Sequence, residues 1–417
     1  MNKYALRQAS PSKLTIAVGL ALGAGATHAA TFNVTSTADA GAGSLRQAIA
    51  DANAAAGPHI IDMSSISGST ITLASDLSGI YEDVDITGAD VTLDGAGSRC
   101  FYGYQASISM SDLTITGCSG TYYGGYLRGG GVYVYGGDLT ITGSTITGNS
   151  ADFGGGVNLA ASAYLTITDS AISGNTAAVN AGGVFANGVT ADLDNVSIQG
   201  NSATGLIGGA FIYADYAAAG ETISVAGSTI SDNTAATGGG IILATYTYEA
   251  TSIDDVLTVE NSTISGNTAD AFPGLYILNQ GFGGKYGDMV ANINASTITG
   301  NQATVGAGAG VLVANGGAYY YDYTATANID NSIISGNTAV VGSGDLESDA
   351  VVPPAPTSTA LGALWQQIAD NPANFQRTVN GVIAGKGNVP TLNNEQITEL
   401  FAGKVASTSR GTTNGVS

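Results

Sequence analysis

Histidine, cysteine and positively charged residues are scarce in this chain of 417 residues. The chain has two His, two Cys and eleven Lys and Arg residues against 32 Asp and Glu, which gives a formal net charge of −21 at pH 7. A chain with this net charge repels the phosphates of nucleic acid, and we therefore expect no nucleic-acid partner. With two His and two Cys, the chain has too few of these residues for us to expect histidine-based catalysis or a metal site built from His or Cys.

The first residues have the pattern of a secretory signal. Lys3, Arg7 and Lys13 precede the apolar run "LTIAVGLALGAGA", which ends at "THAA". We therefore expect a signal peptide over residues 1–29 and export of the remaining chain. The apolar run is shorter than a membrane-spanning helix, and no later stretch reaches 18 consecutive apolar residues.

One short phrase returns seven times with small changes, beginning with "STITGNSA" and ending with "SIISGNTA". Every copy keeps one Asn, and neighbouring copies lie 26 to 36 residues apart. These residues are Asn149, Asn175, Asn201, Asn233, Asn267, Asn301 and Asn337. The related phrase "LTITGC" places Cys118 in the same column, 31 residues before the first Asn. A unit of this length, with a constant core and a variable remainder, is typical of a solenoid.

Each repeat contains three stretches of strand length, exemplified by "LTIT", "STIT" and "GGVYV", which are bounded by Gly, Asn or Ser. Three strands per coil, each about 4.8 Å from its counterpart in the next coil, predict an all-β parallel solenoid. Two apolar columns should then point inward and form the core. They are Ile146, Ile172, Ile198, Ile230, Ile264, Ile298 and Ile334, and Ile141, Ile167, Leu193, Val225, Val259, Ile293 and Ile329.

The constant Asn follows Gly in most copies, at the bend between two strands. Asn tolerates the left-handed backbone conformation better than other non-glycine residues, so we expect it to adopt that conformation. Stacked at one coil spacing, the Asn amides should also hydrogen-bond to one another along the axis. The column is therefore predicted to be a structural Asn ladder rather than a binding site.

Both ends of the solenoid should be covered. At the N-terminal end, "GSLRQAIADANAAAG" predicts a helix whose first turn carries a capping box of Ser44 and Gln47. At the other end, amphipathic patterns predict two or three short helices. The expected organisation is a signal peptide at 1–29, a cap helix and first coils at 30–97, regular repeats at 98–345, a Pro-rich linker at 346–359 and a helical tail at 360–417.

The phrases "GGGV" or "GGAF" with "STISGNTA", preceded by "GSLRQAIADAN", resemble bacterial exported proteins with right-handed parallel β-helix repeats of the pectate-lyase-like superfold. The repeats also resemble those of polymorphic outer-membrane proteins. The N-terminal phrase resembles a Cys-Ser-Leu-Arg-Glu-Ala motif in which Gly43 and Gln47 replace Cys and Glu. The resemblance covers about residues 31–341. It implies a right-handed β-helix, secreted or at the cell surface of a bacterium, and leaves the function open because this superfold serves many functions.

The sequence contains few residues of the kinds that polysaccharide cleavage needs. Polysaccharide-cleaving members of the superfold need paired carboxylates, or a cation beside a base. Between residues 60 and 350 the only basic residues are Arg99, Arg128 and Lys285, and the adjacent acid pair that could be compared with such a site, Asp254-Asp255, lies in a polar loop. Calcium remains open, but no loop has a recognised calcium spacing, so we assign no metal site and no cofactor. The outward acids available to calcium include Asp192, Asp194, Glu260 and Asp330.

Cys100 and Cys118 are the only cysteines. In an exported chain they either pair as a disulfide or pack as small hydrophobic residues, and the sequence leaves this open.

Threonine pairs flank an inward Ile at Thr114/Thr116, Thr140/Thr142 and Thr166/Thr168. We expect these pairs to stack into a Thr-x-Thr array, which resembles the flat faces of ice-binding solenoids. Outward Thr is also ordinary strand chemistry.

Insertions that lengthen the later repeats are rich in tyrosine, and they should project along one side of the solenoid, where repeat proteins often bind. Tyr offers a broad apolar face and a hydroxyl, which suit contact with a sugar or a protein. These residues are Tyr213, Tyr216, Tyr246, Tyr248, Tyr286, Tyr319, Tyr320, Tyr321 and Tyr323. We therefore expect an exported, non-catalytic, adhesin-like scaffold that binds a polysaccharide or a cell-surface protein. A polysaccharide lyase or glycoside hydrolase is the alternative, and an ice-binding solenoid is a third.

Overall fold

The computed structural model describes residues 29–161, 164–215, 222–247, 255–281, 289–306, 308–315, 325–340, 344–347 and 381–384. The predicted signal peptide, apart from residue 29, and the predicted linker after residue 347 lie outside the described residues. Among the residues that are described, no helix is both long and apolar enough to cross a membrane.

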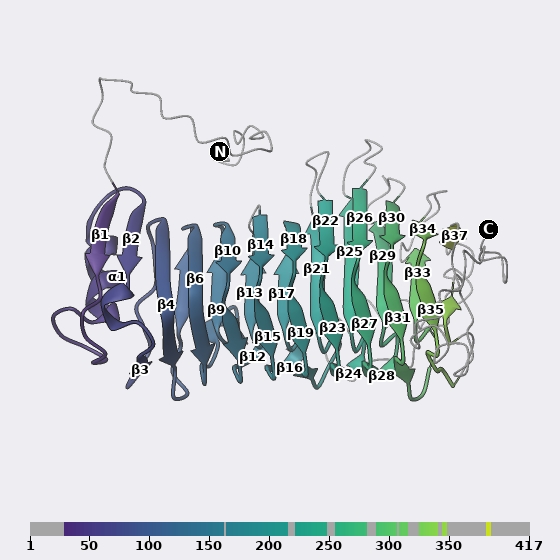
Figure 1. The fold of residues 1–417 in the computed structure, drawn as a ribbon, viewed down its shortest axis with the longest axis horizontal. Helices are drawn as coiled ribbons and strands as arrows, with labels where there is room; N and C mark the ends of the chain where they lie inside the picture. Colours follow the sequence, from purple (N-terminus) through teal and green to yellow (C-terminus); the bar gives the residue numbers. More distant parts are fainter. Residues whose placement is uncertain are drawn as a thin grey trace, which may run out of the picture.

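The chain is an all-β parallel β-helix, in which successive coils stack along one axis (Figure 1). This confirms the predicted fold class. The strands form three sheets, which we call A, B and C.

Sheet A contains two strands from most coils. Its strands are β1 Ala30–Asn33, β2 His59–Asp62, β3 Thr70–Thr72, β4 Val84–Asp94, β6 Ile108–Thr116, β10 Leu139–Thr142, β11 Thr145–Thr147, β14 Tyr164–Thr168, β15 Ala171–Ser173, β18 Thr190–Asp194, β19 Ser197–Gln199, β22 Thr222–Ala226, β23 Thr229–Ser231, β26 Asp255–Glu260, β27 Thr263–Ser265, β30 Met289–Asn294, β31 Thr297–Thr299, β34 Ala325–Asp330, β35 Ile333–Ser335 and β37 Gly381–Ala384.

Sheets B and C each take one strand per coil. Sheet B consists of β5 Phe101–Tyr104, β9 Val132–Tyr135, β13 Val157–Ala160, β17 Val184–Asn187, β21 Ala210–Asp215, β25 Ile241–Thr247, β29 Leu275–Gly281, β33 Val311–Asn315 and β36 Leu346–Glu347. Sheet C consists of β7 Thr121–Tyr123, β8 Tyr126–Arg128, β12 Ser150–Phe153, β16 Thr176–Asn180, β20 Ser202–Ala203, β24 Thr234–Thr237, β28 Thr268–Ala271 and β32 Gln302–Ala303.

A regular coil therefore has four strands, and the prediction of three per coil was wrong. In one coil, β10 and β11 lie in sheet A, β12 in sheet C and β13 in sheet B. The additional strand, in sheet C, directly follows the constant Asn, where residues such as "SADF" lack a clear alternation of apolar and polar side chains. This strand forms because it pairs in parallel with the strand of the neighbouring coil, and not because its own sequence favours a strand.

The two apolar columns form the core, as predicted. Ile146 pairs with Ile172 and Ile172 with Ile198, so that identical side chains lie directly above one another. Every residue of both columns is at most 2% exposed. Full burial of Ile or Leu contributes about 1.5–3 kcal/mol per side chain, which makes this thin core the main source of stability.

The constant Asn residues form a continuous hydrogen-bonded ladder inside the coils. The Oδ1 of Asn175 accepts from both the backbone N–H and the Nδ2 of Asn149, at 3.0 Å each. The Nδ2 of Asn175 also donates to the carbonyl of Ile146 at 2.9 Å. The same pattern repeats through Asn337, and all seven side chains are buried. The ladder begins at Cys118, whose N–H donates to Asn149.

The backbone conformation predicted for this column was wrong by one residue. The left-handed residue is the one before each Asn, with φ between +57° and +71°. It is Gly in six coils and Asp232 in the seventh. The Asn itself keeps an ordinary conformation, because its side chain must point inward to reach its neighbours.

An aspartate ends the ladder. Asp345 Oδ1 accepts from the N–H and the Nδ2 of Asn337, at 3.0 and 3.1 Å, in the place that the next Asn would occupy. Burial raises the pKa of the Asp345 carboxyl, while the two hydrogen bonds from Asn337 act in the opposite direction. At this position a charged Asp345 therefore stabilises the fold less than a neutral side chain that makes the same two hydrogen bonds.

We predict that Asp345→Asn raises Tm at pH 7, by roughly 1–2 °C. Because the folded-state pKa of this acid lies above its unfolded value, its ionisation reduces stability as the pH rises through the unfolded value. Below about pH 3, where the carboxyl is protonated in both states, the variant and the wild type should melt together. Asp192→Asn, on an exposed carboxylate of β18, is the matched control. An equal Tm for wild type and Asp345→Asn at both pH values would contradict this account.

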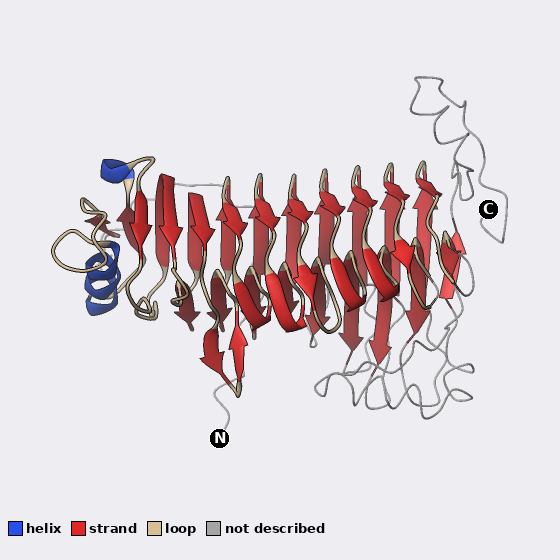
Figure 2. Cartoon of the chain, turned by 90° about the horizontal axis from the view of Figure 1, so that it is seen from below, coloured by secondary structure: helices blue, strands red, loops and turns tan. Residues whose placement is uncertain are grey.

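A helix covers the N-terminal end. Helix α1 (Leu45–Ala54) lies there together with the short 3-10 helix η1 (Ser64–Ile66), as Figure 2 shows. Ser44 caps α1 by accepting from the N–H of Gln47, but the second half of the predicted capping box is not formed. Gln47 donates to Asp51 instead, one turn along the helix.

At the other end, the prediction of a helical tail fails for the only part of residues 360–417 that the structure describes. Gly381–Ala384 forms strand β37, which pairs in parallel with β34. The run "GVIA" contains two β-branched residues and lies beside an otherwise unpaired sheet edge, and both conditions favour a strand.

Candidate binding surface

The structure describes little of the predicted tyrosine loops. Tyr213 lies in β21, half-buried, and its ring centroid is 5.9 Å from that of Phe211. Tyr246 belongs to β25, but its side chain lies outside the described part. The others, Tyr216, Tyr248, Tyr286, Tyr319, Tyr320, Tyr321 and Tyr323, lie outside the described residues, as does Asp254 of the predicted acid pair. The binding role of these residues stays a prediction.

Another group of tyrosines lies among the described residues and was not predicted. We call it the tyrosine platform, and it consists of Tyr81, Tyr102, Tyr104, Tyr123, Tyr126, Tyr133 and Tyr135. It lies over the first two strands of sheet B, β5 and β9, and the hairpin formed by β7 and β8. The signal was present in "FYGY" and "TYYGGYLRGGGVYVY", and in the 31-residue spacing from Cys118 to Asn149, which is five longer than the next.

Strand register builds the base of the platform. Tyr102 is the parallel partner of Tyr133, and Tyr104 is the partner of Tyr135, so each pair points outward at one coil spacing. Their rings stack with centroids 5.5 and 5.7 Å apart. Tyr123 of the hairpin tilts against this base, with its centroid 5.2 Å from Tyr135. Stacked aromatic pairs of this kind contribute about 0.5–1.5 kcal/mol beyond their burial.

The hairpin is the one antiparallel pair among the described strands, and it stands out from the row of coils (Figure 2). Gly124 and Gly125 form its two-residue turn, with φ of +63° and +90°. Positive φ at both positions suits the right-handed twist of the two strands, and glycine adopts it without strain.

A disulfide fixes the base of the hairpin. Cys100, just before β5, is bonded to Cys118, just before β7, with their Cα atoms 5.7 Å apart. The two cysteines are therefore paired, a point that the sequence left open. Since the N–H of Cys118 also bonds Asn149, the hairpin starts from a position held to both sheet B and the Asn ladder.

The platform has an exposed surface and a buried base. Tyr81 is 55% exposed and Tyr123 37%, whereas Tyr133 is fully buried. Tyr122, which is 74% exposed, follows the alternation of β7 and points to the other face of the hairpin. The Tyr133 hydroxyl has no hydrogen-bond partner among the described residues. Burial raises the pKa of this hydroxyl, so it stays protonated and remains a hydrogen-bond donor at neutral pH. Large exposed aromatic rings that gather on one surface mark a contact site.

Two arginines flank the platform. The guanidinium carbon of Arg99 lies 5.6 Å from the ring centroid of Tyr102. That of Arg128 lies 5.0 Å from the ring centroid of Phe153, which itself packs against Tyr126. Cation–π contacts of this length hold a guanidinium in place while leaving its charge available to other groups.

Beyond the platform, the outward face of sheet B continues as an apolar column that is no longer exposed. The column runs from Tyr133 through Asn158, Phe185, Phe211, Ile242, Tyr276 and Leu312. In the later coils Leu206, Ile207 and Phe272 cluster with it, and Ile242, Tyr276 and Leu312 are at most 3% exposed. Strands such as "IILA" are apolar at every position because both faces of this sheet are buried.

The predicted Thr-x-Thr array forms in part. Thr140 and Thr142 stack on Thr166 and Thr168, as expected. On their other side they stack on Ser109 and Ser111, and not on Thr114 and Thr116. The latter pair stacks on Thr145 and Thr147 of the next strand in the coil. The correction arises because β6 is long enough to span both strand positions of its coil, so that "LTIT" at 113–116 corresponds to the second position.

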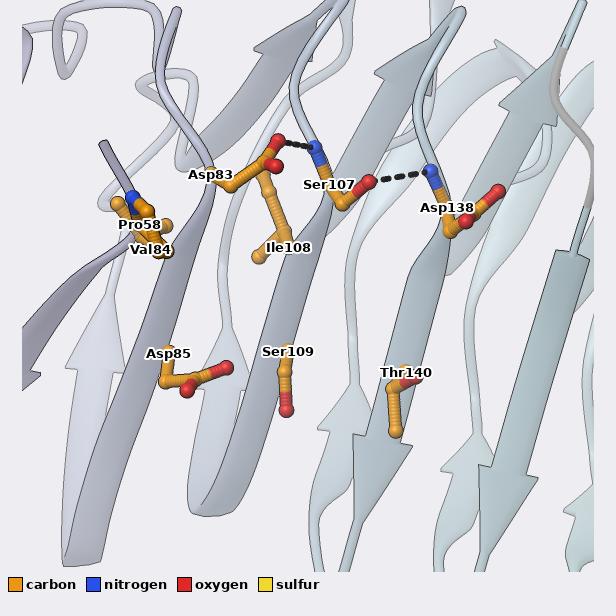
Figure 3. A pocket seen from close by; sticks show the side chains of 9 residues that line it. All are labelled: Pro58, Asp83, Val84, Asp85, Ser107, Ile108, Ser109, Asp138 and Thr140. Carbon is orange, nitrogen blue, oxygen red and sulfur yellow. Dashed lines mark hydrogen bonds between the residues drawn. The ribbon is translucent and has the colours of Figure 1, made fainter. Parts of the chain in front are cut away.

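A shallow recess lies on sheet A near its N-terminal end, with a volume of about 120 Å³ (Figure 3). Its acids serve the backbone: Asp83 accepts from the N–H of Ser107, and Ser107 Oγ accepts from the N–H of Asp138. Asp138 in turn accepts from the N–H of Tyr164. Within the described ranges, no three His, Cys, Asp or Glu side chains lie close enough to hold a metal ion.

Over the described residues, the geometry thus defines a parallel β-helix with an exposed aromatic surface near its N-terminal end. No protein-family model matches the chain, and no curated protein matches it either.

Proposed function

We propose that this protein is an exported binding scaffold whose tyrosine platform contacts a glycan at a cell surface or in the extracellular medium. The observation that carries the proposal is the combination of exposed Tyr81 and Tyr123 with a rigid base of stacked rings. Sugars offer flat C–H faces and hydroxyls, which fit the apolar face and the polar tip of Tyr. The disulfide and the ladder support the proposal because a platform held rigid loses little entropy on binding.

A glycan is the ligand that we favour. The exposed large hydrophobic side chains on the platform are all tyrosines, whose flat rings and hydroxyls match the C–H faces and hydroxyls of a sugar. Tyr and Arg are also enriched at protein interfaces, so binding of a cell-surface protein is the competing outcome. A lyase or hydrolase remains the alternative function, and cleavage of a polysaccharide by the purified chain would favour it.

The test is binding of the purified chain to an array of neutral and acidic oligosaccharides, followed by titration of one oligosaccharide that binds. We predict that Tyr81→Ala with Tyr123→Ala weakens binding at least about thirtyfold, because these are the exposed rings of the platform. Tyr164→Ala is the matched control, since Tyr164 is 47% exposed but lies on sheet A. Unchanged binding by the double variant, or no binding to any oligosaccharide, would overturn the proposal.

A further inference from the structure

We propose that the tyrosine platform is specific for a glycan bearing anionic groups, carboxylate or sulfate, which Arg99 and Arg128 bind. This inference rests on the proposed function and adds the chemical class of the ligand. The tyrosines alone do not determine whether the glycan is charged. The evidence for an anionic glycan is where the positive charges lie and whether they are paired.

Positive charge is rare in this chain, so its position is informative. Only eleven Lys and Arg residues face 32 Asp and Glu, and the described ranges contain three arginines, Arg46, Arg99 and Arg128. In so acidic a protein, an arginine would be expected to pair with a carboxylate of the same chain.

Arg46 shows what a paired arginine looks like here. Its Nη2 lies 2.6 Å from Asp39 Oδ1 in the one salt bridge among the described residues, and it also donates to the carbonyl of Ser75. The guanidinium beside Asp39 holds the pKa of that carboxyl below its usual value. Arg46 therefore holds the N-terminal loops together, and its charge is already paired with that of Asp39.

Arg99 and Arg128 are different, because neither has a carboxylate within salt-bridge distance in the described part of the chain. Arg99 Nη2 donates to the carbonyl of Leu77, and Arg128 Nε donates to that of Tyr123 at 3.4 Å. Each guanidinium is otherwise oriented by an aromatic ring, Tyr102 or Phe153. Both are half-buried, which strengthens their interaction with an anion relative to a fully solvated charge.

Both charges border the platform. Arg99 lies over Tyr102, which stacks on Tyr133, and Arg128 belongs to the hairpin strand that leads into β9 and lies over Phe153. A guanidinium presents a planar set of N–H donors that matches carboxylate and sulfate oxygens. The platform therefore combines rings for the sugar faces with two fixed donors for its acidic substituents, in a protein whose net charge repels anions elsewhere.

The experiment uses an array in matched pairs, on which oligosaccharides of hyaluronan, alginate and chondroitin sulfate lie beside their carboxyl-reduced or desulfated counterparts. We expect the wild type to bind the acidic members at least about tenfold more tightly than the neutral ones. Comparison of sulfated, desulfated and carboxyl-reduced chondroitin distinguishes sulfate from carboxylate as the group that is bound. Polyglutamate tests whether a sugar is needed at all.

Arg99→Gln and Arg128→Gln should each reduce binding of the acidic members about tenfold and leave any weak binding of the neutral members unchanged. Lys285→Gln removes a positive charge elsewhere and is the control. Arg99→Lys keeps the charge and should retain part of the affinity, which guards against a loss caused by misfolding. Equal binding of both members of a pair, unchanged binding by both Gln variants, or equally tight binding of polyglutamate would overturn the inference and leave glycan binding standing. No signal from any oligosaccharide would overturn both proposals.

Discussion

Asn267→Leu is expected to lower the free energy of unfolding by about 4 kcal/mol, although the new side chain is apolar and similar in size. Asn267 Oδ1 accepts from the N–H and the Nδ2 of Asn233, and its own Nδ2 donates to Ile230 O and Asn301 Oδ1. Leucine removes all four bonds and leaves their partners buried. Each buried polar group left without a partner costs about 1–3 kcal/mol, and partial relaxation of the coil reduces the sum.

Urea unfolding followed by circular dichroism measures this loss. Asn292→Leu is the matched control, because Asn292 lies on the half-buried outward face of β30 and takes no part in the ladder. The control loses one half-exposed hydrogen bond, which Asn328 Nδ2 donates, so we expect it to change stability by less than about 1 kcal/mol. If Asn267→Leu unfolds at the same urea concentration as the control, the ladder does not stabilise the solenoid and its role has been misassigned.

Removal of the disulfide with Cys100→Ala and Cys118→Ala is expected to cost about 3 kcal/mol, because the bond closes a loop across a sequence separation of 18 residues. The same change frees the base of the hairpin, so Tyr123 should pack less tightly on Tyr133 and Tyr135. We therefore expect weaker glycan binding together with lower stability.

The comparison with chemical reduction isolates the bond itself. Dithiothreitol should lower the unfolding midpoint of the wild type toward that of the double variant and should leave the variant unchanged. A double variant that unfolds and binds as the wild type does would show that packing alone fixes the hairpin.

Much of the solenoid was predictable because it repeats. The phrase around Asn149 recurs seven times with little change, and a one-residue shift would expose every inward Ile, so the register of these strands follows from the sequence alone. The inward columns through Ile146 and Ile141 and the ladder of Asn side chains all follow from this regularity.

Features that depend on pairing between distant residues were not predictable in the same way. The strand at Ser150–Phe153 has little pattern of its own and exists because β8 and β16 pair with it. The register of Thr114 and Thr116 depends on the length of β6, which no local pattern reveals. The strand Gly381–Ala384 forms against β34, more than fifty residues earlier in the chain.

The tyrosine platform was not predicted, because the segment that forms its hairpin is shorter than the later insertions. The hairpin insertion is short, and it follows Cys118 in the chain instead of a Gly-Gly strand. Its rings also come from three separate segments around Tyr102, Tyr123 and Tyr133, which only the coiling brings together. The charge pattern did point there, since Arg99 and Arg128 border these segments.

One titration tests the central claim that the constant residues build the solenoid and the tyrosine platform binds. An oligosaccharide that binds on the array is titrated against wild type, Asn267→Leu and the Tyr81→Ala, Tyr123→Ala double variant, at a temperature where all three are folded. We predict that Asn267→Leu binds like the wild type despite its lower stability, and that the double variant loses binding while losing less stability than Asn267→Leu. Loss of binding by Asn267→Leu, with binding retained by the double variant, would contradict the account.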